Sequence, residues 1–136
     1  MYSNASITIY NKYTDRTTRT DAYKRTVIKN VFLDEKKATN RLQSGLNDAD
    51  QVLLLIPFDY ASQAKYVAPI EFKELENKEN HFTLQNGDRI VKGDISYEVT
   101  SKISDLDKEY QTFTITSVDT KDFGSRKMRH WEVGGS

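Results

Sequence analysis

Apolar and polar residues alternate along several short stretches of the chain, and no long stretch has helical periodicity. Alternation with a period of two is typical of β-strands that bury one face. The stretches that predict strands are residues 6–10, 23–33, 51–56, 82–93, 111–118 and 128–133. We therefore expect a mainly β protein.

The apolar residues of the predicted strand 23–33 change face partway along it. Val31 and Leu33 fall on one face of an extended chain, whereas Ile28 and Phe32 fall on the other. This pattern predicts either a β-bulge or a strand that is buried on both sides.

The stretch 82–93 contains the strongest local signal for a β-hairpin. Apolar, strand-forming residues flank Asn86-Gly87 on both sides. These two residues tolerate positive φ, as a type I′ turn requires. We expect the second strand of the hairpin to end or bulge at Gly93, because glycine in a strand marks such positions.

Two segments have no clear periodicity, residues 34–50 and residues 59–80. A connection as long as the first is uncommon inside a compact domain and is usually functional or disordered, and we favour function. In the second segment Pro69 opens a short predicted helix, since its missing N–H costs nothing in the first turn. The sequence thus predicts one domain over residues 1–133, followed by a flexible tail at residues 134–136.

The predicted fold class is mainly β: a small antiparallel β-barrel or sandwich with two long loops and at most one or two short helices. Lys plus Arg and Asp plus Glu both number 20, so no overall field attracts nucleic acid or an anionic membrane. The absence of cysteine excludes disulfides and thiolate metal sites. No signal peptide is visible, and the longest apolar run, residues 52–57, is too short to span a bilayer. We expect a soluble intracellular protein.

No arrangement of residues predicts catalysis, a cofactor or a metal site. His81 and His130 are the only histidines, and neither has a second ligand at metal-binding spacing. Two Asp-x-Asp pairs, at residues 48–50 and 105–107, lack the further oxygen ligands that a cation loop needs. We expect no enzyme, and the remaining catalytic alternative is a hydrolase or lyase built on His130 and nearby carboxylates.

One basic and aromatic cluster lies near the C-terminus, where Arg126, Lys127 and Arg129 are close to Phe123 and Trp131. Aromatic side chains on strands beside cations bind single-stranded nucleic acid in barrel proteins. The simpler interpretation is a hairpin end whose cations protect an edge strand from pairing. An OB-like barrel that binds single-stranded nucleic acid is therefore an alternative function.

Segments of this chain, in their order and spacing, resemble a family of head–tail connector proteins of long-tailed phages and prophages of Gram-positive bacteria. They are residues 6–13 (SITIYNKY), 84–93 (LQNGDRIVKG), 115–118 (ITSV) and 128–133 (MRHWEV). The layout is similar to that of head-closure, or stopper, proteins. In those a β-barrel carries a Gly-Asp-x-Ile-Val-x-Gly hairpin and ends in a His-x-Glu-Val-like strand.

The resemblance implies a minor capsid protein with a structural role at the head–tail interface of the virion, assembled in the host bacterial cytoplasm. Such proteins form a ring of copies beneath the portal and adaptor, retain packaged DNA and offer a docking surface to the tail. The DNA passes nearby without sequence-specific contact, and no membrane is involved. Because residues 59–80 exceed what a minimal stopper barrel needs, a tail terminator or another connector protein is an alternative.

In stoppers the loop between the second and third strands projects into the channel, and residues 34–50 occupy the matching place here. We expect this loop and the tail from Trp131 onward to contact neighbouring connector subunits. The residues predicted to interact are Lys36, Lys37, Asn40, Arg41, Leu42, Gly45, Leu46, Asn47, Arg126, Arg129 and Trp131.

Overall fold

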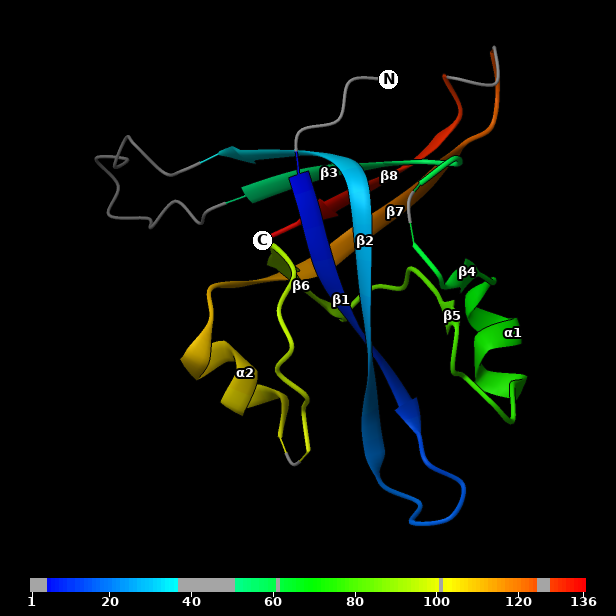
Figure 1. Ribbon diagram of the computed structural model, residues 1–136, viewed down its shortest axis with the longest axis vertical. Helices are drawn as coiled ribbons and strands as arrows, with labels where there is room; N and C mark the ends of the chain where they lie inside the picture. The colour runs from blue at the N-terminus through cyan, green and yellow to red at the C-terminus, as the bar shows by residue number, and fades with distance from the viewer. Residues whose placement is uncertain (1–4, 37–50, 61, 101, 125–127) are drawn as a thin grey trace, which may run out of the picture.

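The computed structural model describes residues 5–36, 51–60, 62–100, 102–124 and 128–136 (Figure 1). Within these ranges the strands are β1 (Ala5–Thr14), β2 (Asp21–Lys36), β3 (Gln51–Pro57), β4 (Lys65–Tyr66), β5 (His81–Phe82), β6 (Arg89–Lys92), β7 (Thr112–Lys121) and β8 (His130–Gly135). The helices are α1 (Pro69–Glu74) and α2 (Ile103–Glu109).

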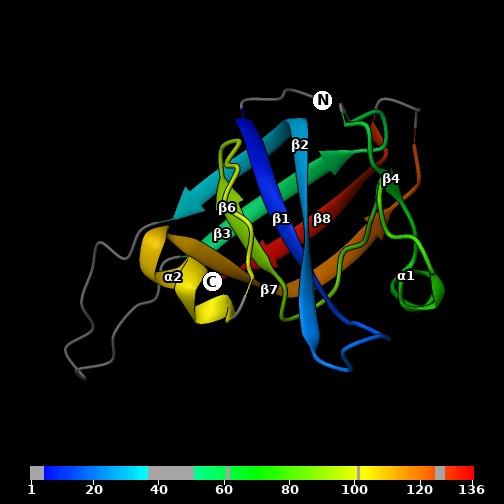
Figure 2. The ribbon, with the colours of Figure 1, turned by 60° about the horizontal axis from the view of Figure 1, so that its bottom comes forward.

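Six of the strands form a closed barrel in the order β1-β2-β3-β8-β7-β6 (Figure 2). Every neighbouring pair in this ring is antiparallel. β4 and β5 form a short parallel pair outside the ring. The two helices lie on opposite sides of the barrel (Figures 1 and 2). The predicted fold class is confirmed.

β2 changes its partner strand near Asn30. Residues 21–31 pair with β1, and residues 32–36 pair with β3. The register shifts at Asn30, whose φ is 62°, and asparagine adopts this left-handed conformation more readily than most residues. Ile28 before the shift and Val31 after it are both buried. The bulge that the change of face predicted is therefore confirmed.

Apolar side chains fill the interior of the barrel. The residues that pack in this interior alternate along β1, at Ile7 and Ile9, and along β3, at Val52, Leu54 and Ile56. Burial of one such side chain contributes roughly 1.5–3 kcal/mol, so this interior is the main source of the stability of the ring.

A second apolar cluster covers the outer face of β1 and β6. Tyr10, Val91 and Leu106 are buried there against partly buried residues of the segment 95–110. The Tyr10 hydroxyl donates a hydrogen bond to the Tyr97 carbonyl at 2.7 Å, and burial raises the pKa of this phenol. α2 and the chain before it thus form a cover over one wall of the barrel.

The hairpin predicted at residues 82–93 is wrong. β5 pairs with β4, and β6 pairs with β1 and β7, so the segments flanking Asn86-Gly87 do not pair with each other. Of these two residues only Gly87 has positive φ, 93°, and the Asp88 N–H donates to the Gln85 carbonyl at 3.4 Å. Positive φ at the third position alone is the pattern of a type II turn.

The chain ends inside the sheet, and the predicted flexible tail at residues 134–136 is wrong. Gly134 and Gly135 belong to β8, which pairs with both β3 and β7. Ser136 exchanges two backbone hydrogen bonds with Thr114, at 2.8 and 3.0 Å. Glycine is needed at both positions because the neighbouring strands leave little room for a Cβ.

Gly135→Ala tests that packing. A Cβ at this position would lie 2.9 Å from Val52 Cγ1 and 3.0 Å from the Thr114 carbonyl oxygen, so the Val52 side chain or the neighbouring backbone has to shift. We expect the free energy of unfolding to fall by about 1–3 kcal/mol, the usual cost of overpacking. Urea unfolding measures this, with exposed Ser136→Ala as the control. Equal stability of Gly135→Ala and the wild type would contradict the packing.

Both segments predicted as long loops contain regular structure. Residues 34–36 belong to β2, whereas residues 37–50 lie outside the described residues. The segment 59–80 contains β4 and α1, and the helix begins at Pro69 as predicted. No helix in the described part of the chain is long and apolar enough to cross a membrane.

Candidate functional site

A buried polar cluster joins β1 to the turn before β6. The side-chain amide of Asn11 donates to the Thr83 carbonyl and to Asp88 Oδ2, both at 2.8 Å. The Thr83 N–H donates back to Asn11 Oδ1 at 3.1 Å, and the Lys12 N–H donates to Asp88 Oδ1 at 3.2 Å. Asn11 and Asp88 are both buried. The cluster therefore fixes residues 83–88 against the barrel wall.

The register of β1 explains why polar side chains are needed here. The last pair between β1 and β6 is Tyr10 with Arg89, so from Asn11 onward β1 has no strand on that side. The Lys12 N–H would otherwise lack a partner, and the Asp88 carboxylate supplies the acceptor. The two side chains thus continue the ladder beyond the end of β6.

Asp88 is the described carboxyl group whose titration the fold changes most. Burial raises its pKa to about 6, and the hydrogen bonds from Asn11 and the Lys12 N–H oppose this rise because they stabilise the charged form. Both carboxylate oxygens accept hydrogen bonds from the protein. Asp88 therefore holds the turn in place through both of its carboxylate oxygens.

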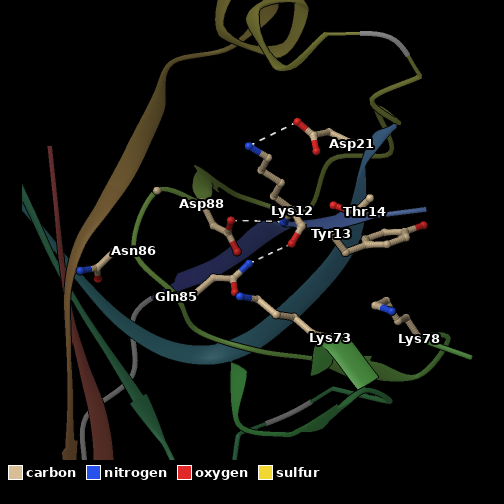
Figure 3. A pocket seen from close by; sticks show the side chains of 10 residues that line it. Lys12, Tyr13, Thr14, Asp21, Lys73, Lys78, Gln85, Asn86 and Asp88 are labelled. Carbon is tan, nitrogen blue, oxygen red and sulfur yellow. Dashed lines mark hydrogen bonds and ion pairs between the residues drawn. The ribbon is translucent and has the colours of Figure 1, made fainter. Parts of the chain in front are cut away.

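A pocket of about 590 Å³ opens beside this cluster, between the β1–β2 hairpin, α1 and the turn before β6 (Figure 3). Lys12 forms a half-exposed ion pair with Asp21 at 3.3 Å. The Lys78 ammonium lies 4.8 Å from the centroid of the Tyr13 ring, and Lys73 points into the same space (Figure 3). The residues that line the pocket are Lys12, Tyr13, Thr14, Asp21, Lys73, Lys78, Gln85, Asn86, Gly87 and Asp88.

The polar and charged lining of this pocket suits it to contact with polar groups. Three ammonium groups and two carboxylates share it, and its polar side chains are mainly engaged with the protein. Among the described residues, no group of three or more histidine and acidic side chains could hold a metal ion.

Trp131, predicted as an interaction residue, is a core residue instead. Its side chain is 8% exposed, and its ring centroid lies 4.4 Å from those of Phe58 and Tyr66 and 6.0 Å from that of Tyr60. The prediction is wrong because Trp131 occupies an inward position of β8, where aromatic residues after β3 close over it. It offers no exposed ring face on which a base could stack.

The other predicted interaction residues are scattered or undescribed. Arg129 is exposed beside the start of β8, and Lys36 ends β2, where its backbone pairs with Gln51. His130 Nδ1 lies 2.7 Å from the Met128 carbonyl, which gives this histidine a local structural contact. Outside the described residues are Lys37, Asn40, Arg41, Leu42, Gly45, Leu46, Asn47 and Arg126.

Comparison with known proteins places the chain in a family without assigning an activity. No curated protein and no solved structure matches it. One family model matches residues 2–136, which is almost the whole chain, and its description is a family of unknown function. The chain therefore belongs to the family of unknown function DUF6751.

Proposed function

We propose that this protein is a structural component of the head–tail connector of a long-tailed phage or prophage. It acts as a stopper-like head-closure protein that retains packaged DNA and provides a docking surface for the tail. The proposal rests on the connector-like order of its sequence segments. One feature of the fold supports it most: residues 37–50 join β2 to β3, the second and third strands of a closed barrel, where stoppers carry their channel loop.

The filled interior of the barrel supports a structural role. Interior positions of the strands are occupied by buried aliphatic and aromatic side chains. The pockets described for the chain lie at its surface and are lined mainly by polar and charged residues. Any partner therefore meets the outside of a rigid unit, as expected for a subunit of a ring.

The strands on either side of residues 37–50, β2 and β3, are held in the barrel wall. Lys36 at the end of β2 pairs with Gln51 at the start of β3. On its other side β3 pairs with β8, through Val52 with Gly135 and Leu53 with Gly134. Both strands that adjoin the segment therefore belong to a three-stranded part of the barrel, β2-β3-β8. A load on the segment would be carried by these strands.

Deleting residues 37–48 tests the proposal. We expect the purified variant to keep a cooperative thermal transition, since the deletion leaves β2 and β3 whole. Phage that carry the deletion should produce heads that lose their packaged DNA, seen by electron microscopy as empty heads and as a loss of infectious titre.

The matched control changes the turn between β1 and β2, where Thr17→Ala with Thr18→Ala alters two exposed residues away from the deletion. Normal titre from the deletion would dismiss the role of the segment. Full heads that hold their DNA but lack tails would instead indicate a protein on the tail side of the connector, such as a tail terminator.

A further inference from the structure

The first half of β2 has one edge that no strand of the described chain covers. Residues 21–31 pair with β1, and β3 joins β2 only from Phe32 onward. An uncovered edge presents backbone donors and acceptors to any extended chain that approaches. This stretch of β2 is the candidate for a binding surface.

The hydrogen-bond pattern shows which groups face the open edge. The Gly93 N–H donates to the Ser6 carbonyl at 2.8 Å, so even-numbered residues of β1 bond toward β6. The N–H and carbonyl groups of odd-numbered β1 residues therefore point to β2. There they pair with even-numbered residues, such as Thr26 opposite Ile9. Arg25 and Val27 consequently direct their N–H and carbonyl groups to the open edge.

Two side-chain contacts agree with this assignment. Ser62 Oγ donates to the Val27 carbonyl at 2.9 Å, and the Lys24 ammonium donates to the Arg25 carbonyl at 2.9 Å. The carbonyls are thus capped by side chains. For the N–H groups of Arg25 and Val27, no acceptor is present among the described residues.

A groove of about 500 Å³ runs beside this edge, between β2 and the chain at residues 62–64. Its lining holds Lys24, Arg25 and Lys29 against one carboxylate, Asp94, while Glu79 and Glu98 also attract the Lys24 ammonium. The third cation, Arg25, is already paired with Glu98 at 2.7 Å. Burial lowers the pKa of Lys24, which is consistent with an ammonium held close to the strand.

We propose that the open edge of β2 binds an extended acidic segment of a partner protein by β-strand addition. The N–H groups of Arg25 and Val27 provide main-chain donors, and Lys24 and Lys29 select carboxylates. Lysines on an edge discourage pairing with neutral or basic strands. The carboxylates of an acidic strand would pair with the same lysines. Lys24 and Lys29 would thus both prevent aggregation and select an acidic partner.

The test uses a short capped peptide of alternating glutamate and valine, titrated into the ¹⁵N-labelled protein at low salt. We expect the largest amide shift changes at Arg25 and Val27, together with slower hydrogen exchange of these two amides. A peptide of alternating lysine and valine should not bind at the same concentrations.

Charge reversal separates this edge from the rest of the surface. Lys24→Glu with Lys29→Glu should weaken binding of the acidic peptide at least tenfold, whereas Lys102→Glu, an exposed change before α2, should not. Val27→Pro removes one free N–H at a position where an edge strand tolerates proline, and it should also weaken binding.

Other outcomes overturn the proposal. Absence of binding by the acidic peptide at millimolar concentration would do so, as would shift changes that spare Arg25 and Val27. Equal or stronger binding of a single-stranded oligonucleotide at the same amides would show that the groove selects phosphate and not an acidic protein segment.

Discussion

Trp131→Ala should reduce the free energy of unfolding by about 3–5 kcal/mol, the usual cost of removing a large buried aromatic side chain. Trp131 is buried and contacts the rings of Phe58 and Tyr66, whose centroids lie 4.4 Å away. Its loss leaves a cavity where β8 meets the chain after β3. Urea unfolding followed by far-UV circular dichroism measures the effect without depending on tryptophan fluorescence.

Phe123→Ala is the matched control, because Phe123 is 70% exposed and belongs to the same predicted aromatic cluster. We expect it to change the free energy of unfolding by less than about 0.5 kcal/mol. Trp131→Phe should recover part of the loss, since a smaller ring still fills the site. If Trp131→Ala and Phe123→Ala proved equally mild, Trp131 would be a surface residue, as the sequence had suggested.

The correctly predicted features of the fold depend on residues close together in the chain. Alternation along residues 6–10 and 111–118 predicted β1 and β7, and the opposed faces of Ile28 and Val31 predicted the bulge at Asn30. Pro69 correctly marked the start of α1. Each of these patterns reflects local backbone geometry and the burial of one face of a strand or helix. Both can be inferred from a few consecutive residues.

The wrong predictions concern contacts between distant parts of the chain. Asn86-Gly87 is a strong local hairpin signal, yet the turn is held by Asn11, which bonds to Asp88 across 77 residues of sequence. Trp131 was likewise assigned to the surface because the aromatic rings that cover it come from the segment after β3. No local pattern predicts that the Asp88 side chain accepts a hydrogen bond from β1 where the pairing with β6 has ended.

The only sequence hint of the polar cluster was its position. Asn11 continues the alternation of β1 at a point where a strand normally places an apolar or small residue, and Asp88 directly follows a glycine turn. Neither observation identifies the other residue as its partner. The partners become evident only when the register shows that β6 begins opposite Tyr10 and leaves the next part of β1 unpaired.

Asp88 should make stability depend on pH in the direction opposite to that of a paired surface carboxylate. Its pKa is raised from 3.8 to about 6 by burial, so between these values the folded protein holds a proton that the unfolded chain has released. The contribution of Asp88 to the free energy of unfolding is therefore largest below about pH 4. It falls as the pH rises to about 6. The shift corresponds to about 3 kcal/mol over the whole range.

Asp88→Asn isolates this contribution, because the variant cannot titrate at this position. Its amide NH₂ has to face one of two donors, Asn11 Nδ2 or the Lys12 N–H, so we expect a loss of about 1–3 kcal/mol at pH 7. The difference in unfolding free energy between wild type and variant should grow as the pH falls from 7 to 4, since only the wild type gains from protonation. A difference that stays constant over this range would show that the folded carboxyl titrates normally.

Asn11→Ala provides the independent check on the cause of the shift. It removes the donor to Asp88 Oδ2, which stabilises the charged carboxylate, so the pKa of Asp88 should rise above its wild-type value. The ¹³C shift of the Asp88 carboxyl carbon, followed from pH 3 to 8, measures this directly, and the Asp21 carboxyl serves as an exposed reference. Because Asn11 also bonds both polar groups of the Thr83 backbone, the same variant loses three hydrogen bonds and should lose about 2–4 kcal/mol of stability at pH 7. An unchanged Asp88 pKa in Asn11→Ala would mean that the turn at residues 85–88 holds its position without the cluster.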